Sequence, residues 1–180
     1  MKKRHYIVIF IIVFLLSALL EMKYLGGIPE RVLRVNWTDE TGTVYRDLAY
    51  GELKKNTYDL YIPHETDKAQ NQRLILFIHG GSFNSGSKED GATWCEYYAS
   101  KGFIAASVNY TLQDHDTYAP LSLMNDQIEA AVSAIKNEIV AQGYNANEMA
   151  VCGVSAGGTL AMNFASTGQS DIPVKFVFQL

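Results

Sequence analysis

The sequence predicts an α/β protein, because short buried-strand patterns alternate with longer helical ones. Four apolar runs have the length and composition of strands covered on both faces: Leu74–Ile78, Ile104–Val108, Met149–Cys152 and Val174–Phe178. Residues 91–101 and 121–142 are expected to be helical, and each segment is followed by a glycine that can end a helix. A length of 180 residues suits one domain of this class, and 48% hydrophobic residues can supply its core.

Two further strands are expected ahead of the first buried run. Residues 46–50 and 57–62 show partial alternation of apolar and polar side chains, and Pro63 closes the second. Residues 51–56 separate them, which favours a hairpin. In the predicted helix of residues 121–142, apolar side chains at helical spacing form one stripe: Leu121, Met124, Ile128, Ala131, Val132, Ile135 and Ile139.

A Gly-x-Ser-x-Gly motif, Gly153-Val154-Ser155-Ala156-Gly157, joins the third buried run to a helix-like segment. This order of strand, sharp turn and helix holds a serine hydroxyl above the sheet, where a base can take its proton. Glycine at 153 and 157 removes Cβ atoms that would collide across so tight a turn. The motif indicates that Ser155 is a candidate nucleophile. A turn serine in a glycine-rich loop is the alternative, and the context in the chain decides between the two.

A second motif, His79-Gly80-Gly81-Ser82, follows the first buried run. Glycines directly after a buried strand let the backbone present N–H groups to an oxygen atom of a substrate. The sequence therefore predicts an oxyanion-hole loop upstream of the nucleophile. The next residues, 84–88, are small and polar apart from Lys88, and they either line a pocket entrance or form plain loop.

Together the two motifs resemble the α/β-hydrolase fold, and within it the lipase and carboxylesterase branch that includes hormone-sensitive-lipase-like and acetyl-esterase-like enzymes. The resemblance covers residues 58–180 and includes Tyr58–Pro63, which is similar to the strand that precedes the oxyanion loop in esterases. It implies an α/β-hydrolase three-layer sandwich, with a mostly parallel sheet and helices on both faces. It also implies a reaction that needs neither a metal ion nor an organic cofactor.

The resemblance assigns roles to the residues of both motifs. In the family, the backbone N–H groups of the loop's third and fourth residues and of the residue after the nucleophile bind the oxyanion. This implies Gly81, Ser82 and Ala156, with His79, Gly80, Gly153 and Gly157 in supporting positions. The family's loop reads His-Gly-Gly-Gly, so Ser82 departs from it. The backbone donor survives that change, but the side chain restricts the φ and ψ angles available.

Charge and cysteine content exclude other classes of protein. The formal charge is −4, and from Glu21 onward 12 basic residues face 19 acidic ones, a net −7. A nucleic-acid-binding protein would instead show a basic patch. The two cysteines, Cys95 and Cys152, do not form a spaced metal or disulfide framework, and we interpret both as small core or surface residues.

The first 27 residues predict a membrane-directed leader. Met1–Arg4 is positively charged, and Tyr6–Leu20 is a 15-residue segment without a charge. That segment spans roughly 22 Å, short of a hydrocarbon core of about 30 Å, which favours a cleaved signal peptide. The absence of a small-residue cleavage site favours an uncleaved signal-anchor with an extracytoplasmic catalytic domain. Residues 28–57 are expected to hold an N-terminal extension and the first edge strand, and residues 58–180 the hydrolase domain.

The acid and base of a catalytic triad are not found after Ser155. In this fold they follow the nucleophile, as Asp or Glu and then His, on loops after later strands. Only Asp171 among acidic residues follows Ser155, and no histidine does. His115, in a polar loop between two aspartates, invites a metal or catalytic interpretation, but it precedes the nucleophile. We therefore expect the hydrolase domain to be C-terminally truncated, the first part of a longer hydrolase.

These features predict a serine hydrolase that acts on small carboxylic esters through an acyl-enzyme on Ser155, inactive or weak in this form. A peptidase or acyltransferase of the same fold is an alternative, since elbow and fold leave the acyl group open. A non-catalytic, membrane-tethered binding module of the same fold is the alternative from another class. The expected partners are an ester substrate and, through the leader, a membrane, and no nucleic acid.

Overall fold

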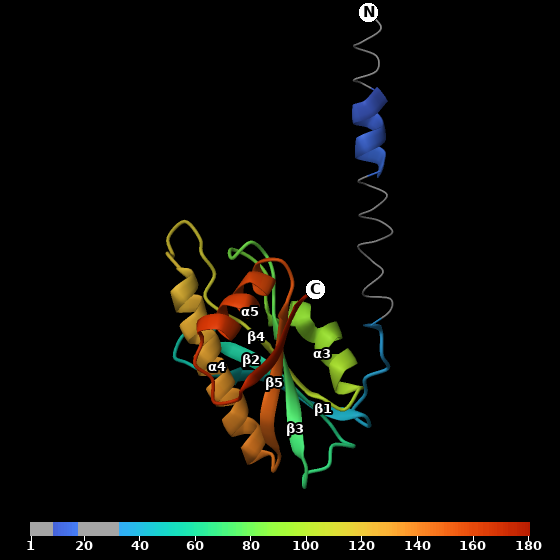
Figure 1. The fold of residues 1–180 in the computed structure, drawn as a ribbon, viewed down its shortest axis with the longest axis vertical. Helices are drawn as coiled ribbons and strands as arrows, with labels where there is room; N and C mark the ends of the chain where they lie inside the picture. Colours follow the sequence, from blue (N-terminus) through green and yellow to red (C-terminus); the bar gives the residue numbers. More distant parts are fainter. Residues whose placement is uncertain (1–8, 18–32) are drawn as a thin grey trace, which may run out of the picture. The chain divides into compact units, whose positions relative to one another are not determined.

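The structure is a computed structural model that describes residues 9–17 and 33–180. The chain divides into two compact units, Met1–Arg34 and Val35–Leu180. The second unit contains both sequence motifs, and its fold is drawn in Figure 1.

In the first unit, residues 9–17 are helical with exposed side chains. Among the residues that the structure describes, no helix is long and apolar enough to cross a membrane. Most of the predicted leader, residues 1–8 and 18–27, lies outside the described residues. The signal-anchor and the cleaved signal peptide both stay predictions.

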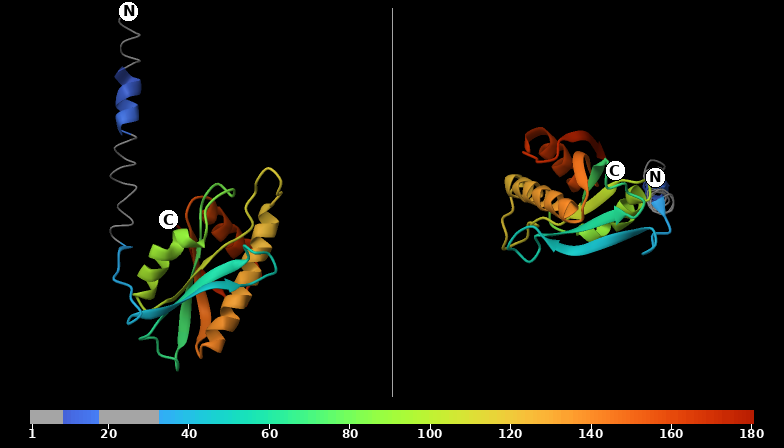
Figure 2. Two further views of the ribbon diagram at one scale, coloured as in Figure 1. Left: turned by 180° about the vertical axis from the view of Figure 1, so that it is seen from behind. Right: turned by 90° about the horizontal axis from the view of Figure 1, so that it is seen from below.

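The second unit is built on a mixed six-stranded sheet with the order β1-β2-β4-β3-β5-β6. Its strands are β1 (Gly42–Ala49), β2 (Thr57–Pro63), β3 (Asn71–Ile78), β4 (Ile104–Val108), β5 (Asn145–Gly153) and β6 (Val174–Gln179). Neighbours among β4, β3, β5 and β6 are parallel, whereas β1 and β2 are antiparallel to their neighbours. The hairpin β1–β2 lies at one edge of the sheet and β6 at the other (Figure 2). The predicted α/β class is confirmed, with helices packed on a mixed sheet.

Strand β1 begins at Gly42, four residues before the predicted start. Thr43 and Val44 pair with Ile62 and Tyr61 of β2. The pairing shifts register between Tyr45 and Leu48, where Asp47 has a φ of 57°. Because a bulge changes which face the following side chains occupy, the two halves of the strand are out of phase. The alternating pattern in the sequence therefore indicated only the second half of β1.

The helices lie on both faces of the sheet. They are the 3₁₀ turn η1 (Lys88–Gly91), α3 (Ala92–Ala99), α4 (Leu121–Ala141) and α5 (Ala156–Thr167). In Figure 1, α4 and α5 lie to the left of the strands and α3 to the right. Six of the seven residues of the predicted α4 stripe are buried, whereas Leu121, the first residue of the helix, is exposed. The helix predicted at 91–101 begins earlier, as η1, and ends at Ala99.

Strand alternation divides the core into two layers. Consecutive side chains of a strand point to opposite faces, so Leu76 packs beneath α4 and α5, and Phe77 beneath α3. Both cysteines are free and lie in the layer between α3 and the sheet, Cys95 on α3 and Cys152 on β5. Burial raises the pKa of the Cys152 thiol to about 12, so this thiol stays protonated at neutral pH. Of the two interpretations, core or surface, both cysteines are core residues.

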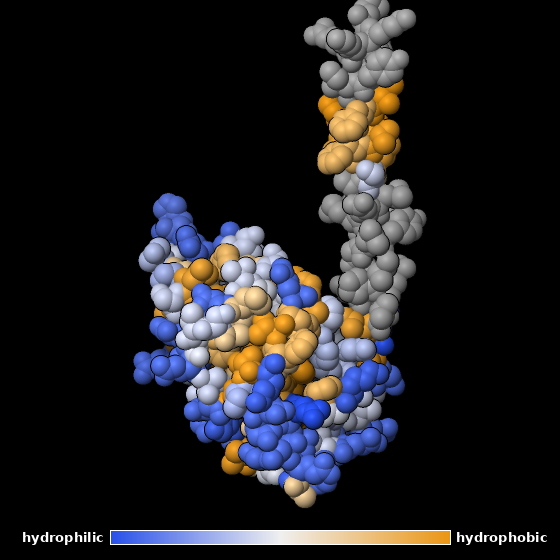
Figure 3. Space-filling view, viewed as in Figure 1, coloured by the Kyte–Doolittle hydropathy of each residue, from blue (hydrophilic) through white to orange (hydrophobic). Residues whose placement is uncertain are grey.

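The last strand differs from its prediction. Residues 174–178 are expected to be a buried strand, but every residue of β6 is exposed or only half-buried, and Phe176 is 65% exposed. The strand pairs with β5 along one edge only. Figure 3 shows apolar surface gathered in the region where Figure 1 draws β6. The exposure has a simple cause, because β6 is an edge strand that α5 and Tyr98 of α3 cover only in part.

Candidate active site

Ser155 occupies a sharp turn between β5 and α5. Strand β5 ends at Gly153 and α5 begins at Ala156, so two residues turn the chain. Ser155 has φ 51° and ψ −116°, a combination that a residue with a side chain rarely adopts. A strained residue of this kind costs about 1–3 kcal/mol and persists only where the surroundings over-determine it. Ser155 is exposed although its neighbours Gly153 and Ala156 are buried, so the turn lifts the hydroxyl out of the sheet.

Tight packing enforces this turn. A Cβ atom at Gly157 would collide with the carbonyl oxygens of Ile78 and His79, at the end of β3. A Cβ atom at Gly153 would collide with the backbone of Gly157. The first turn of α5 therefore sits directly against the end of β3, which is only possible because these positions lack side chains.

The predicted oxyanion-hole loop contains a run of left-handed residues. Gly81 has a φ of 106°, Ser82 of 52° and Phe83 of 65°. The N–H groups of Asn84 and Ser85 both donate to the carbonyl oxygen of Gly81, which closes the turn. The sequence identified the restriction at Ser82 but gave no sign of the one at Phe83. Two consecutive non-glycine residues in this region make the loop a second strained segment of the site.

His79 anchors the start of this loop. Its side chain is 1% exposed, its Nδ1–H donates to the Gly80 carbonyl oxygen at 2.7 Å, and its ring stacks on Tyr110 with centroids 4.3 Å apart. The Tyr110 hydroxyl donates to the His79 carbonyl oxygen at 3.0 Å. Burial lowers the pKa of His79 below its usual value, against the opposing effects of the Gly80 hydrogen bond and of Asp90 and Glu89. The ring is therefore neutral at pH 7 and supports the loop.

The loop and the elbow lie side by side because their strands are neighbours. β3 and β5 are parallel and adjacent, and Ile78 pairs with Gly153 at their carboxyl ends. A Cβ atom on Gly80 would lie 3.6 Å from the Cβ atom of Ser155. Within the described chain, the N–H groups of Gly81 and Ser82 donate to no other group. Two unused backbone donors therefore directly follow Gly80, the loop residue that packs against Ser155.

A pocket of about 880 Å³ opens next to the loop. Its lining comes from the loop, from residues 113–120 and from the start of α4: Ser82, Phe83, Asn84, Gln113, Asp114, His115, Tyr118, Ala119, Pro120, Leu121 and Met124. Asn84 of the predicted entrance segment lines it, whereas Lys88 does not. The His115 ring is exposed and pairs with Asp116 at 3.0 Å. In the described ranges, no group of three or more His, Cys, Asp or Glu residues could hold a metal ion.

Residues 33–180 bring no triad partner to Ser155. Its hydroxyl is hydrogen-bonded to no side chain of the described chain. Asp171 precedes β6, which runs parallel to β5, so it lies at the opposite end of the strands from the elbow. There its Oδ2 accepts a hydrogen bond from Ser133 and its carbonyl oxygen one from Lys136 Nζ, both at 3.0 Å. Asp171 is thus a structural residue of the α4 surface.

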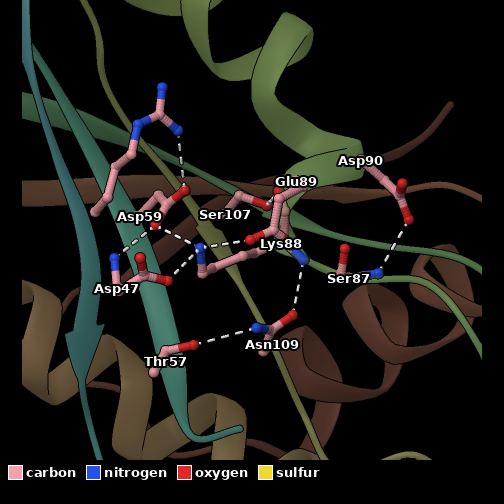
Figure 4. Close-up of polar contacts among 10 residues, drawn as sticks. Asp47, Thr57, Asp59, Ser87, Lys88, Glu89, Asp90, Ser107 and Asn109 are labelled. Carbon is pink, nitrogen blue, oxygen red and sulfur yellow. Dashed lines mark hydrogen bonds and ion pairs between the residues drawn. The ribbon is translucent and has the colours of Figure 1, made fainter.

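Sequence reasoning missed an ion cluster next to this site, which we call the Lys88 cluster: Arg46, Asp47, Asp59, Lys88 and Glu89 (Figure 4). Lys88 Nζ lies 2.8 Å from Asp59 Oδ1, 2.9 Å from Asp47 Oδ1 and 2.8 Å from Glu89 Oε1. An Arg46 nitrogen lies 3.4 Å from the other oxygen of Asp59. The one local signal was Asp59, a carboxylate inside the otherwise apolar run of β2.

The sheet, the helices on both faces and the serine elbow define the class: an α/β-hydrolase fold of which the chain covers a part. The BD-FAE family model matches residues 58–176, and the chain belongs to this family. The family of esterases suggested by the two motifs is therefore confirmed.

Individual relatives agree with this assignment. The chain is 30% identical over 121 residues to a probable isoprenylcysteine alpha-carbonyl methylesterase of Oryza sativa subsp. japonica, covering 66% of this chain and 27% of that protein. Esterase B of Lactobacillus rhamnosis has a similar fold, with a TM-score of 0.69 at 18% identity over 91% of this chain and 57% of the esterase. A bacterial heroin esterase matches with a TM-score of 0.62 at 26% identity, covering 88% and 50% of the two chains. The chain spans about half the length of these two structures.

Proposed function

We propose that this chain carries the nucleophile and the oxyanion hole of a serine hydrolase acting on small carboxylic esters. The observation that carries the proposal is the strained, exposed Ser155 beside a loop whose Gly81 and Ser82 N–H groups are unused. Strain at an exposed hydroxyl is expected where a nucleophile must be presented. The names of the relatives, a methylesterase and two esterases, favour ester substrates. The adjacent pocket, which Ser82 lines but Ser155 does not, has the volume to hold a small ester.

In the proposed reaction, Ser155 Oγ attacks the acyl carbon and a base takes the hydroxyl proton. The electron pair of the carbonyl π bond moves to its oxygen, and the N–H groups of Gly81, Ser82 and Ala156 stabilise that oxyanion. Collapse of the tetrahedral intermediate expels the alcohol, which receives the proton, and leaves an acyl-enzyme on Ser155. Water then attacks the acyl-enzyme and releases the acid.

The base and its acid partner are proposed to come from a longer form of the protein. Residues 33–180 place no base on the Ser155 hydroxyl, and the chain covers 57% of esterase B. A hydrolase without its base keeps only the part of catalysis that binding and the oxyanion hole supply, roughly 10³–10⁴-fold over water. We therefore expect this chain alone to react slowly, and an added base to accelerate it.

Chemical rescue tests the proposal. The full chain is incubated with a fluorophosphonate probe at pH 7.5, with and without imidazole as the added base, and the modified serine is located by peptide mass spectrometry. We expect labelling at Ser155 that speeds up with imidazole concentration and is absent in Ser155→Ala. Ser166→Ala, an exposed serine of α5, is the matched control and should label normally. A folded chain that is never labelled at Ser155 would instead be a non-catalytic module of this fold.

We also propose that residues 1–27 place the hydrolase domain on the extracytoplasmic side of a membrane, as an anchor or as a signal for secretion. The support is the basic start followed by an uncharged apolar segment. Cell fractionation with mass spectrometry of the mature N-terminus tests this. A membrane-bound chain with residues 1–27 intact indicates an anchor, a processed chain outside the cytoplasm indicates secretion, and a cytosolic chain contradicts both.

A further inference from the structure

The Lys88 cluster combines deep burial with charge. The side chains of Lys88 and Asp59 are 3% and 1% exposed. Taking both ions out of water is costly, and a well-packed apolar pair of similar size is often as stable or more so. What an ion pair adds over an apolar contact is a fixed distance and direction between two groups. We therefore interpret the cluster as a means of fixing the relative positions of its segments rather than as a source of stability.

Lys88 is not placed to act on a substrate. Its amino group is surrounded by the carboxylates of Asp47, Asp59 and Glu89, and it does not line the pocket beside the loop. Although burial opposes the change, hydrogen bonds to Asp59, Glu89 and Asp47 raise the pKa of Lys88 above its usual value. The amine stays charged and fully engaged, so its role is to hold neighbouring segments together.

Lys88 joins the end of the oxyanion-hole loop to the β1–β2 hairpin. The lysine sits in η1, which directly follows the loop, whereas Asp47 belongs to β1 and Asp59 to β2. The backbone of Lys88 is tied as well: its N–H donates to Asn109 Oδ1 and its carbonyl oxygen accepts from Ser107 Oγ, both at 2.7 Å (Figure 4). Ser107 lies at the end of β4, and Asn109 is the first residue after the strand.

The loop between its two anchors is strained. It starts at His79, which is fixed by burial, stacking and the Tyr110 hydrogen bond, and it ends at Lys88. Between them, Gly81, Ser82 and Phe83 are all left-handed. Strained segments relax when one of their constraints is removed. The segment is also held at Phe83, whose carbonyl oxygen accepts a hydrogen bond from the Gln113 N–H. Losing the Lys88 side-chain contacts would therefore loosen the amides of Gly81 and Ser82 rather than release them.

We propose that Lys88 is a positioning residue that, through Asp59 and Asp47, locks the C-terminal end of the loop to the β1–β2 hairpin. The lock aims the Gly81 and Ser82 N–H groups at the acyl centre of the substrate that Ser155 attacks. The aim at an acyl centre rests on the proposed function. The locking of the loop does not, and it can be measured without any reaction.

Amide hydrogen exchange of the full chain tests the lock. Lys88→Met removes the charge and keeps the length of the side chain. We expect exchange in peptides that cover residues 80–87 to become about tenfold faster, while peptides of β5 stay within about twofold. Lys88→Arg keeps the charge and should restore most of the protection. Lys136→Met, which removes a lysine bonded to the Asp171 carbonyl oxygen, is the matched control and should leave the loop unchanged.

A milder variant covers the case in which Lys88→Met does not fold. Asp47 is 74% exposed and has a φ of 57°, which asparagine tolerates well, so Asp47→Asn should fold and still loosen the loop about twofold to threefold. Loop exchange equal to wild type in Lys88→Met and Asp47→Asn would overturn the proposal. So would a rise shared equally by β5, since that is what a purely structural lysine predicts.

Labelling in imidazole adds the link to catalysis. If Ser155 of the wild-type chain reacts, Lys88→Met should label about tenfold more slowly than wild type and Lys88→Arg close to wild type. Unchanged labelling in Lys88→Met would overturn the aiming role. If wild-type Ser155 never reacts, the proposed function fails by itself, while the exchange data still support or overturn the lock.

Discussion

Gly157 provides a sharp test of the packing that shapes the elbow. In an exposed helix, replacing glycine by alanine stabilises by about 1 kcal/mol, because alanine loses less backbone entropy. At Gly157 the new Cβ atom would collide with the carbonyl oxygens of Ile78 and His79, both backbone atoms that cannot rotate away. Relieving such overpacking costs about 1–3 kcal/mol or more. We expect Gly157→Ala to be destabilised by about 1–2 kcal/mol, a reversal of the helix preference.

Gly158 is the matched control one residue along the same helix. There the three atoms nearest to a new Cβ atom all belong to the side chain of Gln179, with Cγ at 2.7 Å, and a flexible exposed side chain can move aside. Gly158→Ala should therefore be neutral or slightly stabilising. Urea unfolding of the full chain, followed by circular dichroism, gives both free energies. If Gly157→Ala is as stable as Gly158→Ala, the contact between α5 and β3 does not constrain the turn as described.

Three further outcomes follow from the same structure. Ser155→Gly should raise the free energy of unfolding by about 1 kcal/mol, since glycine adopts positive φ freely, whereas Ser155→Ala should not. The pKa of His79 is lower in the folded than in the unfolded chain, so the unfolded chain binds more protons below pH 6.5. The free energy of unfolding should therefore fall as the pH drops through 6.5 toward the folded-state pKa. Urea titrations at several pH values should show that His79→Asn lacks this component. Phe176→Glu should reduce self-association in sedimentation velocity with little effect on urea unfolding, because the Phe176 side chain is 65% exposed on the edge strand. Self-association equal to that of the wild type would exclude β6 as the contact.

The sequence predicted those parts of the fold whose signal is local. The run Ile104–Val108 matches β4 at both ends, and the predicted 121–142 helix corresponds to α4 within one residue. In both, burial follows directly from a run or a stripe of apolar side chains. The bounds of β1 were not predictable in the same way, because the bulge at Asp47 is fixed by pairing with β2 rather than by its own residues.

The candidate site was predictable only where glycine marks it. The elbow and the start of the oxyanion loop contain the glycines that tight turns need, and the structure places them next to each other because β3 and β5 are neighbours. The left-handed Phe83 carries no such mark. Lys88 was also missed, since its carboxylate partners come from β1, β2 and η1, and only the fold brings those segments together.

The most direct test of Ser155 as nucleophile is a crystal structure of the full chain after reaction with a phosphonate ester. The phosphonyl oxygen takes the place of the oxyanion. We expect phosphorus bonded to Ser155 Oγ and one oxygen about 2.7–3.1 Å from the backbone nitrogens of Gly81 and Ala156. An adduct on another serine, or one on Ser155 whose oxygen points away from these N–H groups, would contradict the assignment of nucleophile and oxyanion hole.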